Sequence, residues 1–256
     1  MKSILSILIG LIGFVSHGWS QNPALGAHAL AAYPLGRSTN LVIFTPALNT
    51  QPSGSTVLVC LGRGNKAAFA NVPTDNKDNP PCRQLGATHS YALWAESGTA
   101  LYAFPLVAGG SGHVISAGTS FQDEVTLTVV EIKDGGVVQD YKWNEVLKGN
   151  PLTSLPVTAT GPATLVAYWW GDGDVGFTHA ATPADGFTVI ESFLPPGALV
   201  QAAVATKEVT TAGTYHVTWD SAGNEGAQLW LVAIQKASAV TNLPSPPVPS
   251  KAGVPE

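Results

Sequence analysis

Glycine and proline are spread so evenly along this chain that long helices have almost no room to form. The sequence holds 27 Gly and 19 Pro, and both residues disfavour a helix interior. Only Asn144 to Lys148 hints at a helical turn. The chain is therefore expected to be built from strands.

Short runs rich in Val, Thr, Ile and aromatic residues recur between clusters of Gly, Pro, Asn and Asp. They lie at 41–45, 56–61, 100–104, 113–116, 124–133, 163–170, 187–192, 200–205, 214–219 and 228–235. Many short strands at this spacing predict an all-β sandwich or barrel.

An internal repeat organises these runs. The segments at 54–61, 110–114 and 127–132 align with those at 161–168, 213–217 and 229–234, at offsets of 107, 103 and 102 residues. Such small drift predicts one unit duplicated once, giving two tandem antiparallel β-sandwich units at 21–134 and 137–238, each with its own core. The alternative is chance similarity between the strands of one larger sandwich.

The two ends of the chain carry different signals. Met1-Lys2, an apolar run over 4–15 and small residues at Gly18 and Ser20 resemble a signal peptide cleaved before Gln21. An uncleaved anchor is the alternative, but the run is short for a membrane span. Residues 239–256 form a Pro-rich tail expected to be extended. The mature protein, without a second long apolar run, is expected to be secreted, periplasmic or at the cell surface.

Charge is sparse in this sequence. Charged residues make up 11% of the chain and the net charge is −5, with no Lys/Arg cluster. Nucleic acid is excluded as a partner, because its phosphates require a basic face. The expected partner is an unknown protein or polysaccharide at the cell surface.

Two cysteines, Cys60 and Cys82, lie in the first unit. In an oxidising compartment such a pair predicts a disulfide, which would stabilise the fold by roughly 3 kcal/mol. Two buried free thiols are the alternative.

The first unit resembles a repeat type of bacterial secreted and surface proteins. The resemblance rests on a Gly-led apolar strand at 54–61, an Asp-Asn turn at 75–79, an aromatic strand at 101–104, Gly109-Gly110 and Val130-Glu131. It implies an immunoglobulin-like or jelly-roll sandwich. It implies no activity, since such sandwiches serve many functions.

No catalytic residue is predicted. Glu131 alternates with Leu127 and Val129, which favours a structural ion pair or hydrogen bond over acid catalysis. His113 and His216 take equivalent repeat positions after a Gly turn, which favours a shared structural role.

No cofactor is predicted either. Oxygen-rich loops make Asp75, Asp78, Asp172 and Asp174 weak calcium candidates, although Asp and Asn are common in turns for conformational reasons.

The best binding candidate ends a strand of the second unit. In the repeat alignment Trp170 matches Arg63, a polar residue expected to reach solvent, and Asp172, Asp174 and His179 follow it. An exposed ring beside carboxylates would suit a sugar. The alternative is that Trp170 belongs to the core or to packing between units, since Trp is usually largely buried.

These observations favour a non-catalytic extracellular structural or interaction protein of bacterial type. A carbohydrate-binding module that uses exposed aromatic residues of the second unit is the second hypothesis. A small hydrolase of unfamiliar type is the third.

Overall fold

The computed structural model describes residues 23–36, 41–64, 69, 71–172, 180–220 and 225–236. Within these residues the chain contains strands and no helix, so none that could cross a membrane. The predicted signal peptide at 1–20 and the Pro-rich tail at 239–256 lie outside the described residues. The prediction of an all-β chain is confirmed.

The described residues of the first half form ten strands. They are β1 (Leu25–Tyr33), β2 (Val42–Phe44), β3 (Leu48–Asn49), β4 (Ser53–Arg63), β5 (Thr74–Asp75), β6 (Arg83–Tyr91), β7 (Trp94–Ala108), β8 (Ser111–His113), β9 (Ile115–Gly118) and β10 (Val125–Ile132).

The described residues of the second half form ten more. They are β11 (Gly136–Gly149), β12 (Leu152–Thr153), β13 (Val157–Ala159), β14 (Ala163–Asp172), β15 (Thr182–Pro183), β16 (Thr188–Phe193), β17 (Val200–Val209), β18 (Gly213–Tyr215), β19 (Thr218–Asp220) and β20 (Glu225–Lys236).

Each half folds by the same plan. A five-stranded antiparallel sheet has the order β1-β10-β4-β7-β6 in the first half and β11-β20-β14-β17-β16 in the second. Small sheets β2-β9-β5 and β3-β8 face the first, and β12-β19-β15 and β13-β18 repeat them in the second half. Every described strand of the first half therefore has a counterpart ten strands later, and the prediction of two repeated β units is confirmed.

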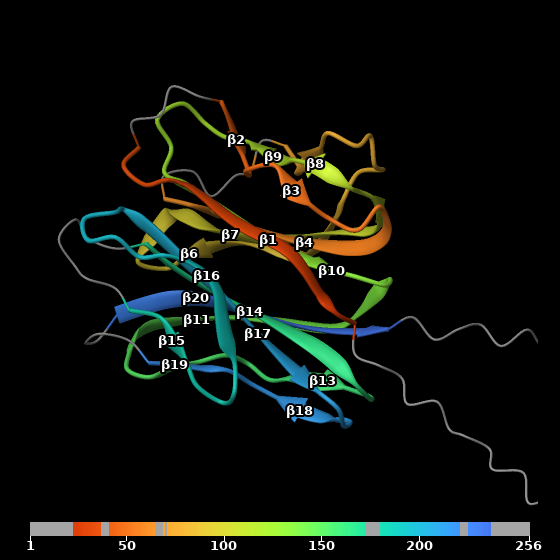
Figure 1. Ribbon diagram of the computed structural model, residues 1–256. Coiled ribbons are helices and arrows are strands. Elements are labelled where there is room, and N and C mark those ends of the chain that lie inside the picture. Colours follow the sequence, from red (N-terminus) through yellow and green to blue (C-terminus); the bar gives the residue numbers. More distant parts are fainter. Residues whose placement is uncertain are drawn as a thin grey trace, which may run out of the picture.

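The two units stack into four layers, with the large sheets inside and the small sheets outside (Figure 1). Each unit has its own core between its large and small sheets, centred on residues such as Val59 and Leu127 in the first and Leu165 and Trp219 in the second. A third core lies between the large sheets. Because β4, β10, β14 and β20 are covered on both faces, their sequences read as continuous apolar runs rather than alternating ones.

The contact between the large sheets is nearly two-fold symmetric. Thr56 on β4 donates a hydrogen bond to the carbonyl oxygen of Gly136 at the start of the second unit, at 2.6 Å. Thr164 on β14 donates in turn to the carbonyl oxygen of Pro23, just before β1. Such reciprocal contacts are the signature of an interface between two copies of one surface.

The true register of the repeat differs by one residue from the sequence alignment along β4 and β14. Leu61 pairs with Leu127, and Trp169 pairs with Leu229. Leu61 and Trp169 are therefore equivalent, whereas the sequence alignment matched Leu61 with Tyr168. A one-residue slip in a strand moves every side chain to the other face. The sequence alignment therefore matched Trp170 with Arg63, whereas its true equivalent in the first unit is Gly62.

This register places Trp170 opposite Gly62 across the interface between the units. Trp170 is 2% exposed, and a methyl group at Gly62 would lie 2.0 Å from its Nε1. The expectation of an exposed Trp170 ring is wrong, and the alternative of packing between units holds.

The same correction applies to Arg63, which was expected to reach solvent. It is fully buried, 3.8 Å from Asp123, and it donates to the carbonyl oxygen of Gly118. Burial lowers the pKa of the guanidinium, and Asp123 opposes that shift.

The disulfide prediction is also wrong. Cys60 and Cys82 are both free and buried, because they occupy different cores. Cys60 faces the second unit, and Cys82 lies in the core of the first, where its Sγ contacts the carbonyl oxygen of Pro73 at 3.3 Å. Burial raises the pKa of both thiols, that of Cys82 to about 11.

Candidate functional site

Glu131 is a structural carboxylate, as its strand position predicted. It is fully buried and accepts hydrogen bonds from the backbone amides of Ala27 and Gln51, at 2.8 and 2.7 Å. The hydroxyl of Ser55 donates a third, at 2.5 Å. These bonds join β1, β4 and β10 and occupy the oxygens that acid catalysis would need.

His113 has a structural role of the same kind. Its Nδ1 lies 2.9 Å from Thr50 Oγ1, and its Nε2 lies 3.3 Å from Asp75 Oδ2. The imidazole is fully buried. His113 on β8 therefore connects Thr50, just after β3, with Asp75 on β5 inside the first unit. His216 is not the counterpart of His113 in the second unit. His113 pairs with Leu48 in the β3–β8 sheet, and Tyr215 takes the same position by pairing with Val157 in the β13–β18 sheet.

The loop that begins at Asp75 is a hydrogen-bonded turn. Oδ1 of Asp75 accepts from the amide of Lys77 and Oδ2 from the side chain of Asn79. Burial alone would raise the pKa of Asp75, but these hydrogen bonds and that of His113 hold it below its usual value. Asp78 is exposed with a left-handed backbone, at a φ of 55°. Both oxygens of Asp75 are thus committed to the turn.

Most of the other predicted site residues lie outside the described structure, so their arrangement stays a prediction. Asp172 ends β14, and its side chain is outside the description, as are Asp174 and His179. Across the described residues no three His, Cys, Asp or Glu side chains form a group that could hold a metal ion.

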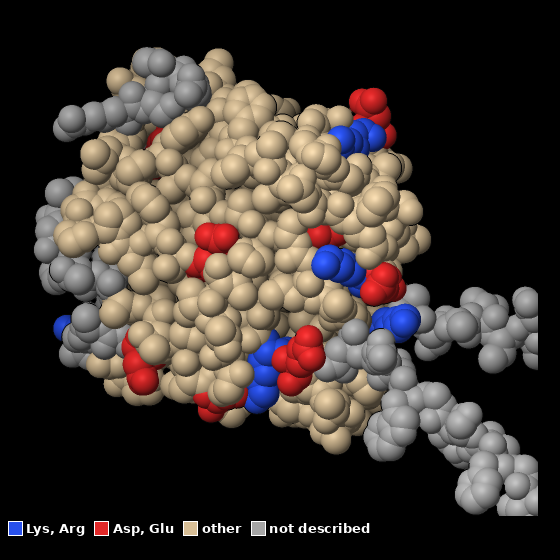
Figure 2. Space-filling model, viewed as in Figure 1, with Lys and Arg blue, Asp and Glu red and all other residues tan. Residues whose placement is uncertain are grey.

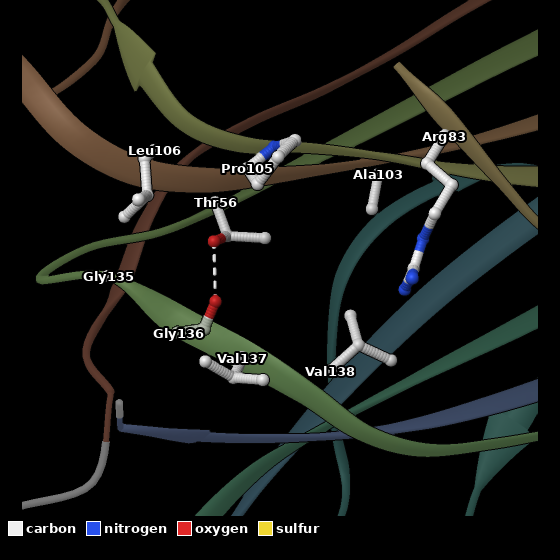
Figure 3. Close-up of a pocket in the computed structure, with 9 residues that line it drawn as sticks. All are labelled: Thr56, Arg83, Ala103, Pro105, Leu106, Gly135, Gly136, Val137 and Val138. Carbon is white, nitrogen blue, oxygen red and sulfur yellow. Dashed lines mark hydrogen bonds between the residues drawn. The ribbon is translucent and has the colours of Figure 1, made fainter. Parts of the chain in front are cut away.

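A pocket lies at the junction of the two units, and we call it the seam pocket (Figure 3). Its volume is about 330 Å³. It is lined by Thr56, Arg83, Ala103, Pro105, Leu106, Gly135, Gly136, Val137 and Val138. The first unit supplies β4, β6 and β7, and the other wall comes from the linking turn and the start of β11.

The pocket exists because β6 and β7 differ in length at this edge. β6 begins at Arg83, opposite Ala103, while β7 continues to Ala108. Pro105 lies on β7 just past the end of its pairing with β6. Proline has no amide hydrogen, and at this position no hydrogen bond to β6 is lost. A bulge in the β4–β7 pairing follows, between Phe104 and Val107.

Leu106 is held at the mouth by an unusual backbone. Its φ is 52°, and its side chain is 67% exposed. The other described non-glycine residues with positive φ are Asp and Gln, and Asp is among the residues that tolerate this region best. For leucine the conformation costs on the order of 1 kcal/mol or more, and such strain tends to collect at functional sites.

Among the described lining residues, Arg83 is the one ionic group, and it lies on an apolar wall. Arg83 reaches from β6 past Ala103 toward Val138 (Figure 3). At the other end the hydroxyl of Thr56 donates a hydrogen bond to the carbonyl oxygen of Gly136. A ligand could bind this hydroxyl or this carbonyl only by breaking the bond between them. Val137 is 52% exposed and completes the mouth with Leu106.

Sequence reasoning missed this site. Its residues come from four separate segments, and only the boundary between the two predicted units, at 134–137, pointed to this part of the chain. Two signals were present in the sequence: a proline within an apolar strand at Pro105, and the Gly135-Gly136 turn between the units.

No known family, curated protein or solved structure matches the chain. The resemblance to bacterial surface repeats therefore stays a prediction.

Proposed function

We propose that this protein is a non-catalytic extracellular interaction protein of bacterial type that binds an apolar group in the seam pocket. The observation that carries the proposal is Leu106, an apolar side chain held in solvent at the pocket mouth by a strained backbone. Exposing it costs stability, and a ligand that covers it would recover apolar burial.

The position and size of the pocket support this function. Ligand sites are typically concave, mostly apolar, about 300–1,000 Å³ in volume, and often placed between domains. The seam pocket lies between two units and has about 330 Å³, which suits a small ligand or one side chain of a partner.

The fate of the polar residues supports a binding rather than a catalytic role. Glu131, His113 and Asp75 are each engaged in hydrogen bonds that join strands. The surface is also sparsely charged, with acidic and basic side chains scattered singly or in small groups over the face in Figure 2.

The fold we propose for each unit is a jelly roll. Strands β1, β10, β4 and β7 share one sheet, and the chain crosses to the other sheet for β2–β3, β5 and β8–β9. Two interleaved Greek keys of this kind define the jelly roll among double-sheet architectures. Proteins of this architecture include many binding domains, which is an analogy of fold only.

The carbohydrate-binding alternative needs an exposed aromatic ring in the second unit. Trp170 is buried, and among the described residues of the second unit no aromatic side chain is exposed.

Binding of the neutral dye Nile red tests the proposal. Leu106→Ser combined with Val137→Ser should weaken dye binding about tenfold, since each change removes apolar contact at the mouth. Leu155→Ser is the matched control, because Leu155 is 47% exposed in the second unit. Equal dye affinity in the double variant, the control and the unaltered protein would refute the proposed site.

A further inference from the structure

We infer that the ligand of the seam pocket is a small monocarboxylate with an apolar body, whose carboxylate binds Arg83. This inference rests on the proposed function, because it names the ligand class of the same pocket. It does not follow from that function, since an apolar pocket can equally hold a neutral ligand.

Arg83 is available for a ligand. Among the described residues its guanidinium has no hydrogen-bond or ion-pair partner, although other cations of the chain do: Lys142 binds Asp140 at 2.8 Å and Arg63 lies beside Asp123. None of the described residues that line the pocket is acidic. A guanidinium left unpaired at the edge of an apolar wall is a natural partner for an incoming anion.

A second cation lies beside the pocket. Lys236 is exposed and stands opposite Gly136 in the β11–β20 pair. Alternation along β20 puts it on the same face as Ile234, which belongs to the core between the units. The nearby acidic residue is Asp134 in the linking turn. It is exposed and is not among the lining residues of the pocket. The local balance is positive in a chain whose net charge is −5.

The shape of the cationic group favours a carboxylate. Guanidinium presents a planar fork of N–H donors that matches the two oxygens of a carboxylate. The remaining walls, Ala103, Pro105 and Val138, offer no further charge for the multiple oxygens of a phosphate. An apolar body against these walls and one carboxylate on Arg83 would satisfy both parts of the pocket.

Displacement of bound Nile red by octanoate, octanol and octylamine at pH 7.5 tests the ligand class. We expect octanoate to compete about fivefold better than octanol, and octylamine to be the weakest, in line with a solvent-exposed ion pair. Arg83→Gln should abolish the preference for octanoate, and Arg83→Lys should keep part of it. Lys142→Gln, which also removes an exposed cation, should leave the preference unchanged.

A second arm separates two sources of the same chemistry. Acetyl-Leu-Leu with a free carboxylate mimics the end of a peptide, and its amide is the neutral control. Arg83-dependent binding of octanoate indicates a fatty acid, and Arg83-dependent binding of the dipeptide acid indicates a chain terminus.

The outcomes also separate this inference from the proposed function. If octanol competes as well as octanoate, and the dipeptide amide as well as its acid, the inference is wrong while the pocket remains a binding site. If the Leu106→Ser/Val137→Ser variant still binds dye normally, the proposed function itself fails.

Discussion

The contact between Gly62 and Trp170 fixes how the two units meet, and two substitutions test it. A methyl group at Gly62 would lie 2.0 Å from Nε1, 2.3 Å from Cδ1 and 2.7 Å from Cε2 of Trp170. The indole is rigid and buried, packed edge-on against Tyr91 with ring centroids 6.0 Å apart. Gly62→Ala therefore cannot be accommodated by a simple side-chain rotation.

The magnitudes follow from burial. Trp170→Ala removes a fully enclosed ring and should lower the free energy of unfolding by about 3–5 kcal/mol. Gly62→Ala should cost about 1–3 kcal/mol through overpacking, although alanine is otherwise better than glycine within a strand. In the double variant the new methyl group enters the space left by the ring, so its cost should nearly vanish.

Urea unfolding followed by far-ultraviolet circular dichroism gives the four free energies of this cycle. Trp94→Ala is the control for loss of a tryptophan, because Trp94 is 60% exposed and its replacement should change stability by about 0.5 kcal/mol or less. We expect a coupling of about 1–3 kcal/mol between the two sites. Additive costs, or a Trp170→Ala cost near that of Trp94→Ala, would refute this packing.

Four further predictions concern single features. Unreduced protein should show two thiols, Cys60 and Cys82, that react with a maleimide only after unfolding, and a reductant should not change the Tm; a bridged pair would show none. Glu131→Gln should cost about 1–3 kcal/mol in urea unfolding, because an amide cannot accept all the bonds that the buried carboxylate does; an unchanged midpoint would contradict its role. Burial lowers the pKa of His89 below 6.5, so the unfolded state binds a proton more readily and the free energy of unfolding should fall as pH drops below about 6.5. His89→Phe should remove part of this acid destabilisation, and an identical pH profile in the variant would contradict the prediction. Leu106→Gly should raise the free energy of unfolding by up to about 1 kcal/mol, through relief of the left-handed strain, while weakening Nile red binding; a large destabilisation would show that the backbone is not strained.

Composition and pattern were enough to predict the strands and their duplication. Val, Thr and aromatic runs between Gly and Pro mark most of the strands, and the repeat anchors lie on β4, β8 and β10 and their counterparts. The helical hint at Asn144 to Lys148 failed because these residues lie in β11, where pairing with β20 overrides local propensity.

The faces of the strands could not be predicted in the same way. Along β4 and β14 nearly every residue is buried, so the apolar pattern gives no alternation with which to fix the register. The one-residue error misplaced Trp170 and Arg63. The disulfide between Cys60 and Cys82 was predicted because both lie in the first unit and in an expected oxidising compartment. The third core explains why one thiol faces the second unit instead.

The seam pocket was beyond reach for a different reason. It depends on where β6 starts relative to β7 and on the turn at Gly135, and neither follows from residue preferences. Arg83 looks in the sequence like any exposed strand end, and its significance comes from the absence of an acidic partner among the described residues around it.

The location of bound ligand is the most direct test of the account. Methyl-labelled protein should be titrated with octanol and, separately, octanoate, and methyl resonances followed by NMR. We expect the largest shifts at Leu106, Val137 and Val138, and none at Leu93 and Leu155, which are as exposed but distant from the pocket in the chain. Shifts centred on Leu93 or Leu155, or no saturable shift with either ligand, would contradict the seam pocket as the binding site.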